Sequence, residues 1–437
     1  MRSILAFAFA ISLALPGTAA QAAPAMAGHW QGTMTEHGQS IPVSFNFAAG
    51  EAGGDFTSET QAATDYPLDS VVRDGDRVTF VLGGGITFHG ALSGDTLAGD
   101  FTTGDQAGSF ALHRAQPAAL PYDVIPVSFA NGDVTLKGTL CIPRTPGRHP
   151  AAVLVHGSGP ETRWGTSRYI AGQLARAGVA ALVYDKRGAG ESGGDWRTSA
   201  FEALARDALA AVDLLRARPD IDAAHIGIVG HSQGGVIAPL AATLAPDKVS
   251  FIVAEDTFAG RQSDQDIYRV SHAIEGLQLA PADRAEAMRV YGLFVDAAHG
   301  AVPYETFAKA AAADQQASWY GWMQFPPRDS WVWTFGRLNG AFDTLPVWRQ
   351  VRAPVLLVYG EKDALGPVGE SITRIEAALD TNHTPYTAIV APDAQHNLTV
   401  QPDDAGPFFW WRQAPGIIDL MADWVAAQTA RGPAANP

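Results

Sequence analysis

The chain has 437 residues, of which 47% are hydrophobic and 17% are charged, a composition typical of a globular protein of two or three domains. It carries 30 Lys and Arg residues against 45 Asp and Glu residues, and its formal net charge is -15. The sequence shows no cluster of basic residues that could bind phosphate groups, so a nucleic-acid partner is not expected. The single cysteine, Cys141, excludes an internal disulfide and a thiolate zinc site.

The N-terminus has the pattern of a cleavable export signal. Arg2 precedes an apolar stretch at residues 4–15, and small residues follow at 20–22 (AQA). We therefore expect a signal peptide over residues 1–22 and a mature chain that is periplasmic or secreted. No later stretch is long and apolar enough to span a bilayer, so we expect no membrane anchor.

Residues 23–115 alternate between apolar and polar positions in short runs, such as 43–47 (VSFNF) and 78–82 (VTFVL). This period of two, broken by glycine and aspartate, predicts antiparallel strands that form a small closed β domain. The opening segment 28–32 (GHWQG) resembles the start of lipocalin-like β domains. Three prolines within residues 116–126 predict a linker to the next domain.

Residues 127–430 alternate buried β runs with amphipathic helical stretches, which predicts a mostly parallel sheet with helices on both faces. The strand candidates are 151–155, 180–184, 226–229, 251–254, 355–359 and 386–390. The stretch at about 259–345, between two of these strands, is too long for a simple connection. It is helical in pattern and rich in tryptophan, and we expect it to form a cap over the active site, whose candidate residues are described next.

Residues 230–234 (GHSQG) match the G-x-S-x-G turn that presents a nucleophilic serine. The motif follows a strand candidate and precedes a helical stretch, which is the context that the turn requires. Small residues flank the serine because the turn is tight. We therefore predict Ser232 as the nucleophile.

A serine hydroxyl needs a base, and the base needs an orienting group, in the chain order Ser, Asp or Glu, His. Asp363 follows the strand candidate 355–359, and His396 follows the last strand candidate. We predict Asp363 as the acid and His396 as the base. Asp256 and Glu361 are the rival acids.

The oxyanion of the tetrahedral intermediate needs two backbone N–H donors. We assign one to Gln233, the residue after the nucleophile. The segment 156–160 (HGSGP) resembles the oxyanion loops of esterases, and we assign the second donor to Ser158, with Gly157 as the alternative. The run 185–192 (DKRGAGES) lacks the spacing of a phosphate loop and is interpreted as structural.

Together these motifs resemble the α/β-hydrolase superfamily, and in particular exported bacterial serine carboxylesterases with two domains and a helical cap. The resemblance implies hydrolysis of a small-molecule ester through an acyl-enzyme, with no cofactor and no metal. An aminopeptidase-like enzyme, an acyltransferase or a thioesterase on the same fold stays open, as does a binding protein that uses the β domain. A peptidase would need acidic residues for the substrate's amino group, and the cap offers Glu275, Glu286 and Glu305.

Overall fold

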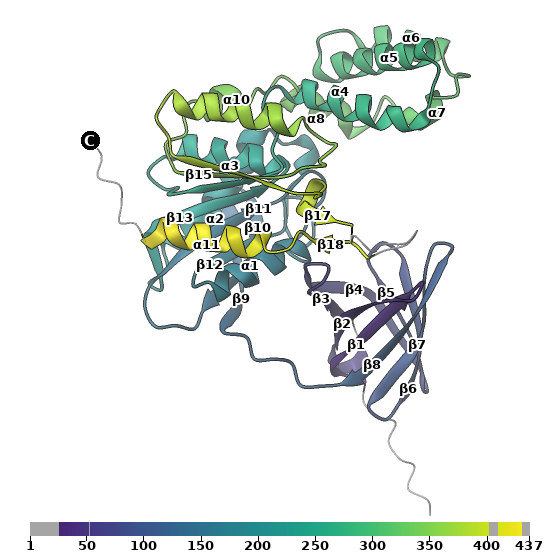
Figure 1. Cartoon of the computed structure of the whole chain (residues 1–437), viewed down its shortest axis with the longest axis vertical. Helices are drawn as coiled ribbons and strands as arrows, with labels where there is room; N and C mark the ends of the chain where they lie inside the picture. The colour runs from purple at the N-terminus through teal and green to yellow at the C-terminus, as the bar shows by residue number, and fades with distance from the viewer. Residues whose placement is uncertain (1–25, 52, 402–409, 431–437) are drawn as a thin grey trace, which may run out of the picture.

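A computed structural model describes residues 26–51, 53–401 and 410–430. The predicted signal peptide, residues 1–22, lies outside these residues. The described chain consists of a β-barrel, a sheet flanked by helices, and a group of helices at the end of the sheet domain away from the barrel (Figure 1). None of the described helices is both long and apolar enough to cross a membrane.

Eight antiparallel strands close into the N-terminal barrel, with β1 paired to both β2 and β8. They are β1 (Gly28–Glu36), β2 (Gln39–Phe47), β3 (Gly54–Ser58), β4 (Ala63–Asp74), β5 (Arg77–Leu82), β6 (Ile86–Ser93), β7 (Thr96–Thr103) and β8 (Gln106–Arg114). Successive side chains of a strand point to opposite faces, and in β5 the buried positions alternate with less buried ones. The prediction of a small closed β domain is confirmed.

Aromatic side chains fill the barrel. The rings of Phe80 and Phe88 stack with their centroids 4.4 Å apart, and Phe45 meets both rings edge-on. Trp30, from the predicted GHWQG segment, is fully buried and donates its indole N–H to the carbonyl of Met26 at 2.8 Å. The interior of this barrel is therefore a packed core, as is usual for eight strands.

The second domain contains an eight-stranded sheet in the order β16-β15-β14-β13-β11-β12-β10-β9. The strands are β9 (Tyr122–Asn131), β10 (Val134–Pro143), β11 (His149–Val155), β12 (Ala180–Tyr184), β13 (Ile221–His231), β14 (Ile252–Glu255), β15 (Val355–Gly360) and β16 (Tyr386–Ala391). The six strands from β11 to β16 are parallel, and β10 and β9 pair antiparallel at one edge. The predicted α/β fold is confirmed, and its ligand crevice is expected at the carboxyl ends of the parallel strands.

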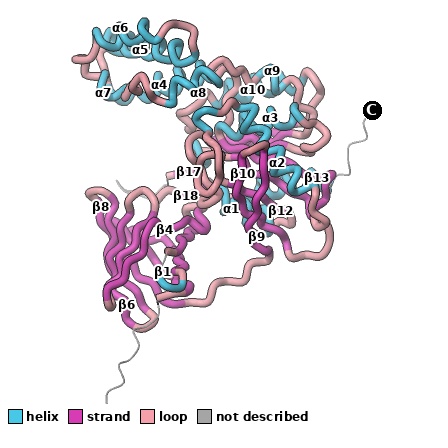
Figure 2. Tube along the Cα trace, turned by 180° about the vertical axis from the view of Figure 1, so that it is seen from behind, coloured by secondary structure: helices cyan, strands magenta, loops and turns pink. Residues whose placement is uncertain are grey.

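Helices cover both faces of this sheet (Figure 2). They are α1 (Thr166–Arg176), α2 (Phe201–Arg216), α3 (Gln233–Leu244), α10 (Val368–Asp380) and α11 (Ile417–Ala430). One apolar core contains side chains of α2, α3 and α10, and a second contains side chains of α1 and α11. The strands β11, β12, β14 and β15 are therefore buried on both faces, whereas the edge strand β16 is partly exposed.

The cap consists mainly of helices between β14 and β15 and has an apolar core of its own. The helices are α4 (Gln262–Ala273), α5 (Pro281–His299), α6 (Tyr304–Ala313), α7 (Tyr320–Met323), α8 (Trp331–Asn339) and α9 (Leu345–Trp348). Trp319 and Trp333 belong to the core of the cap, whereas Trp348 packs into the core of the sheet domain.

The linker predicted at residues 116–126 is shorter in the structure, because β9 already begins at Tyr122. Pro126 lies within β9, where it is in register with Thr139 of β10. A proline is tolerated there because β9 is the edge strand and its outer side has no partner strand to accept a hydrogen bond. Pro126 was therefore misleading as a sign of irregular chain, whereas Pro117 and Pro121 lie before β9 in the irregular segment that was predicted.

The barrel contacts the sheet domain through the start of β4. Thr64 and Gly165 exchange two backbone hydrogen bonds, and the Arg168 Nε atom lies 2.9 Å from the Asp65 carboxylate. The Arg168 side chain is buried on α1, where it also donates to the Cys141 sulfur at 3.1 Å. The ion pair therefore fixes the barrel against the sheet domain.

Replacing Asp65 with alanine is expected to destabilise the protein, because it leaves a buried guanidinium without its carboxylate. We expect a loss of about 2 kcal/mol, less than for a fully buried pair, because the Asp65 side chain is 33% exposed. This loss in the free energy of unfolding is measured by urea unfolding, monitored through tryptophan fluorescence. Asp123→Ala, which removes an exposed pair with Arg144, is the control and should cost about 0–1 kcal/mol. Equal midpoints for the two variants would contradict the prediction.

The segment after β16 returns to the barrel. Strands β17 (Thr399–Val400) and β18 (Arg412–Gln413) form a short antiparallel pair. Trp410 donates its indole N–H to the carbonyl of Gln39 in the barrel at 3.3 Å, and Gln413 donates to the carbonyl of Asn397 at 3.3 Å. This segment therefore contacts both the barrel and the loop that follows β16.

Candidate active site

Ser232 lies on the sharp turn between β13 and α3. Its φ of 53° is in the left-handed region, which is strained for a serine. A Cβ atom added at Gly230 would lie 2.1 Å from the carbonyl oxygen of Gly234, and one added at Gly234 would lie 2.1 Å from that of Val155. The two glycines are therefore needed for the turn, and Ser232 stands at the carboxyl edge of the sheet, as the G-x-S-x-G pattern predicts.

Asp363 and His396 lie on the loops that follow β15 and β16. The His396 Nδ1 atom is 2.9 Å from a carboxylate oxygen of Asp363. A carboxylate accepts here, so Nδ1 carries the proton and the neutral ring keeps an unprotonated Nε2. His396 and Ser232 line the same cavity. An acceptor nitrogen and a hydroxyl are thus available in one cavity, as proton transfer from serine requires.

The pKa of His396 reflects opposing effects. Burial lowers it, but the hydrogen bond and charge of Asp363, with further contributions from Asp256 and Glu161, raise it to a net value above the usual one. The neighbouring His231 ring lies 5.2 Å from the His396 ring, and burial lowers the pKa of His231 to about 4. His231 is therefore neutral near neutral pH.

Asp256, a rival acid from the sequence, lies beside this pair. Its carboxylate accepts hydrogen bonds from the amides of Gly360 at 2.8 Å and Asn397 at 3.2 Å. It therefore connects the loops of Asp363 and His396. Burial raises the pKa of Asp256 to about 7. Glu361, the other rival, accepts instead from the amide of Asp393.

In two groups of side chains, three possible metal ligands lie within 4.8 Å of one another. The first group is His231, Glu255 and Asp256, and the second is Asp256, Asp363 and His396. Burial raises the pKa of Glu255 to about 8 and that of Asp256 to about 7. Asp363 and His396 of the second group are already hydrogen-bonded to each other, and Asp256 accepts from two backbone amides.

The predicted oxyanion loop follows β11, and Gly157, Ser158 and Gln233 line the cavity with Ser232. Gln233 is the first residue of α3, so its amide has no partner within the helix and lies at the positive end of the helix dipole. The Glu161 carboxylate accepts a hydrogen bond from the amide of Gly157. Because the Gly157 amide has this partner, Ser158 is the better second donor.

Lys186 connects this loop to the start of α3, although the sequence predicts only a structural role for its segment. Its buried ammonium group donates to the carbonyl of Gly157 and to the side-chain carbonyl of Gln233, both at 2.7 Å. Burial lowers its pKa to about 8, while the charge of Glu161 raises it. Lys186 comes two residues after β12, next to the β11 loop in the sheet, and this position was the signal that sequence reasoning missed.

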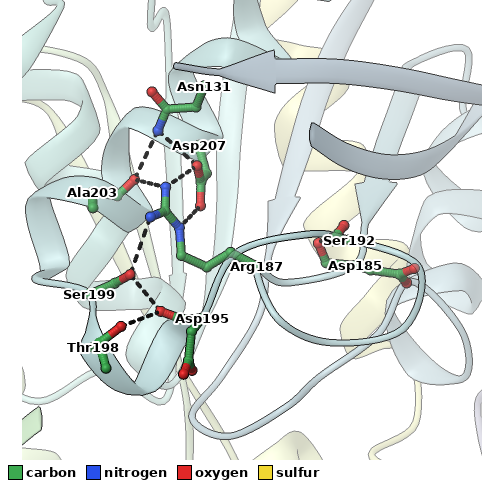
Figure 3. A network of polar contacts seen from close by, with 9 residues as sticks. All are labelled: Asn131, Asp185, Arg187, Ser192, Asp195, Thr198, Ser199, Ala203 and Asp207. Carbon is green, nitrogen blue, oxygen red and sulfur yellow. Dashed lines mark hydrogen bonds and ion pairs between the residues drawn. The ribbon is translucent and has the colours of Figure 1, made fainter. Parts of the chain in front are cut away.

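The residues around Lys186 are held by a buried polar network (Figure 3). The Arg187 guanidinium donates two hydrogen bonds of 2.6 Å to the carboxylate of Asp207 on α2, and a further one of 3.2 Å to Ser199. Ser192 closes the loop by donating to the carbonyl of Asp185 at 2.7 Å. The charge-assisted pair with Asp207 holds Arg187, the residue after Lys186. The hydrogen bond from Ser192 holds Asp185, the residue before it.

A cavity of about 970 Å³ lies between the carboxyl edge of the sheet and the cap. Of the tryptophans in the predicted cap, Trp322 and Trp331 line it. The predicted amino-group ligands Glu275, Glu286 and Glu305 are not among the lining residues; each pairs with an arginine at an exposed position. The acidic residues that do line the cavity are Glu161 and Asp266.

The fold and this site define a class of protein, and a comparison of the sequence with family models identifies that class. A sequence model of the alpha/beta hydrolase family matches residues 152–405, more than half of the chain. The chain therefore belongs to the alpha/beta hydrolase family.

Two curated relatives match part of the chain. Esterase EstD of Thermotoga maritima is 36% identical over 129 residues, which are 28% of this chain and 31% of EstD. The alpha/beta hydrolase domain-containing protein WAV2 of Arabidopsis thaliana is 37% identical over 86 residues, which are 20% of this chain and 26% of WAV2. The matches thus span less than a third of each relative.

Two solved structures match this chain at low sequence identity and with TM-scores below 0.5. A hypothetical protein, PA2218 from Pseudomonas aeruginosa, is 20% identical with a TM-score of 0.46, over 71% of this chain and 95% of that one. Est1E from Butyrivibrio proteoclasticus is 15% identical with a TM-score of 0.43, over 70% of this chain and 99% of that one.

Proposed function

We propose that this protein hydrolyses carboxylic esters through an acyl-enzyme formed on Ser232. The observation that carries the proposal is the hydrogen-bonded pair of His396 and Asp363 in the cavity that the strained Ser232 turn also lines. A nucleophile, a base and an orienting acid in this relation are what acyl transfer needs.

The Ser232 hydroxyl attacks the ester carbonyl carbon while His396 Nε2 takes its proton. The amides of Gln233 and Ser158 donate to the oxyanion. When the intermediate collapses, the carbon–oxygen bond to the alcohol breaks and His396 returns the proton to the leaving alcohol. Water then attacks the acyl-enzyme by the same route and releases the acid and free Ser232. Asp363 keeps His396 in the required tautomer and stabilises its charged form.

The surroundings of the cavity favour an ester over a peptide substrate. The cap glutamates that an aminopeptidase could use are exposed and paired with Arg284, Arg289 and Arg328. The matching segment of EstD, a protein named as an esterase, supports the same choice.

A fluorophosphonate probe and a series of p-nitrophenyl esters test the proposal. We expect one phosphonyl group per chain on the peptide that contains Ser232, and a burst of p-nitrophenol before steady turnover. An aminoacyl p-nitroanilide is the competing substrate. Faster turnover of the anilide than of every ester, or labelling at another residue, would overturn the proposal.

The activity is expected to depend on pH through His396. The ring must be neutral to accept the serine proton, so kcat/KM should fall as the pH decreases through its pKa, which lies above the usual histidine value. Asp363→Asn removes the hydrogen bond and charge that raise this pKa, so the inflection of the residual activity should move to lower pH. Profiles of kcat/KM from about pH 5 to pH 9 measure both. An unmoved inflection would contradict the prediction.

A further inference from the structure

One face of α4 is polar where it meets the cavity. The cavity-lining residues of this helix are Gln262, Gln265, Asp266, Arg269, Val270 and Ala273. Their spacing places them on one side of the helix. A helix usually turns its apolar side inward, so packing does not account for the first four of these residues.

These polar side chains interact with one another and with α5. Asp266 accepts a hydrogen bond from Gln262 and lies 3.9 Å from the Nε2 atom of His299. Arg269 donates to the hydroxyl of Tyr291 at 3.4 Å. The cap therefore presents several donors and acceptors to the cavity from two helices.

The charges of this group offset one another. Burial raises the pKa of Asp266 to about 6, and the charge of Arg269 lowers it, so Asp266 is a carboxylate at neutral pH and faces a cation of its own. Burial lowers the pKa of His299, which keeps its ring neutral. A neutral, hydrogen-bonding ligand matches this balance better than an ion does.

Aromatic side chains from other parts of the cap line the same cavity. Trp322 and Trp331 are 38% and 41% exposed, and Phe294 and Phe335 also line the cavity. Flat apolar surfaces with a few converging polar groups suit a ligand that has both C–H faces and hydroxyl groups. A plain hydrocarbon chain would cover the α4 side chains without hydrogen-bonding to the donors and acceptors that they still present to the cavity, which is costly.

We infer that the polar face of α4 is a binding site for the polyhydroxylated alcohol part of the substrate, so that the enzyme acts on an acylated sugar. This inference rests on the proposed ester hydrolysis and names its substrate class. Hydroxyl groups of the sugar would hydrogen-bond to Asp266, Arg269 and the two glutamines, while the tryptophans contact its C–H face.

Two acetates of six-carbon primary alcohols test the inference: glucose 6-acetate and hexyl acetate. Wild-type protein should prefer glucose 6-acetate in kcat/KM. Asp266→Asn should lower the ratio of the two kcat/KM values about 10-fold or more, because a hydrogen bond to a charged group is lost. Asp264→Asn, at an exposed position of α4 that does not line the cavity, is the control and should keep the wild-type ratio.

Preference for hexyl acetate, or a ratio that Asp266→Asn does not change, would overturn the inference. So would a preference for acetylcholine that Asp266→Asn abolishes, because Asp266 would then bind a cation. Binding of free glucose to Ser232→Ala protein, measured by saturation-transfer NMR, needs no turnover. Binding that Asp266→Asn weakens supports the sugar site even if ester hydrolysis fails, and no binding overturns it.

Discussion

Replacing Ser232 with alanine is expected to lower kcat/KM for p-nitrophenyl acetate by about 10⁴-fold or more. The variant has no hydroxyl group to form the acyl-enzyme, whereas the backbone donors and His396 remain. Turnover and fluorophosphonate labelling, both measured on the purified protein, should be lost together.

The thermal unfolding temperature separates this loss from misfolding. Ser232→Ala should unfold at or above the wild-type temperature, since the change removes a hydroxyl from a strained position without creating a clash. Ser70→Ala, at an exposed position of barrel strand β4, is the matched control and should keep full activity. Burst kinetics that persist in Ser232→Ala would assign the nucleophile to another residue.

Replacing Lys186 with methionine is expected to lower kcat by about 10²-fold, the usual effect of losing one oxyanion donor. The carbonyl of Gly157 and the side chain of Gln233 would lose a shared donor, so the amides of Ser158 and Gln233 would no longer be held in place. Glu161 would also lose its counter-charge. KM should change little, because these donors act mainly on the transition state.

A trifluoromethyl ketone, which forms a tetrahedral adduct, distinguishes this role from a structural one. Its affinity should fall in Lys186→Met by about the same factor as kcat, while Lys248→Met, which removes an exposed pair with Asp213, should change neither. A lower unfolding temperature with unchanged kcat and inhibitor affinity would show that Lys186 only stabilises the fold.

The sequence predicted well those features that depend on local pattern. Strand, turn and helix around Ser232 follow one another directly, so the serine could be placed on its turn without any long-range information. The order of motifs along the chain likewise placed Asp363 and His396 on the loops that follow the adjacent parallel strands β15 and β16, where they form a hydrogen bond.

The features that sequence reasoning missed depend on contacts between distant segments. Lys186 touches Gly157 and Gln233 because β11 lies between β12 and β13 in the sheet, an order that differs from the order in the chain. Asp266 faces the cavity because of how the cap sits on the sheet domain, which no periodicity of α4 reveals. For the same reason the sequence offered Glu275, Glu286 and Glu305 as acidic residues of the cap without placing them, and none of the three lines the cavity.

The contact between Trp410 and the barrel links catalytic competence to the order of protein synthesis. The barrel leaves the ribosome first, whereas the strand pair that supports the loop after His396 is made more than 280 residues later, by comparison of Arg114 with Thr399. All eight strands of the barrel, with Gln39 among them, are complete in the chain before any strand of the sheet domain is translated. A nascent chain that ends before Trp410 lacks this support, so the loop that carries His396, the proposed base, gains it only late in synthesis.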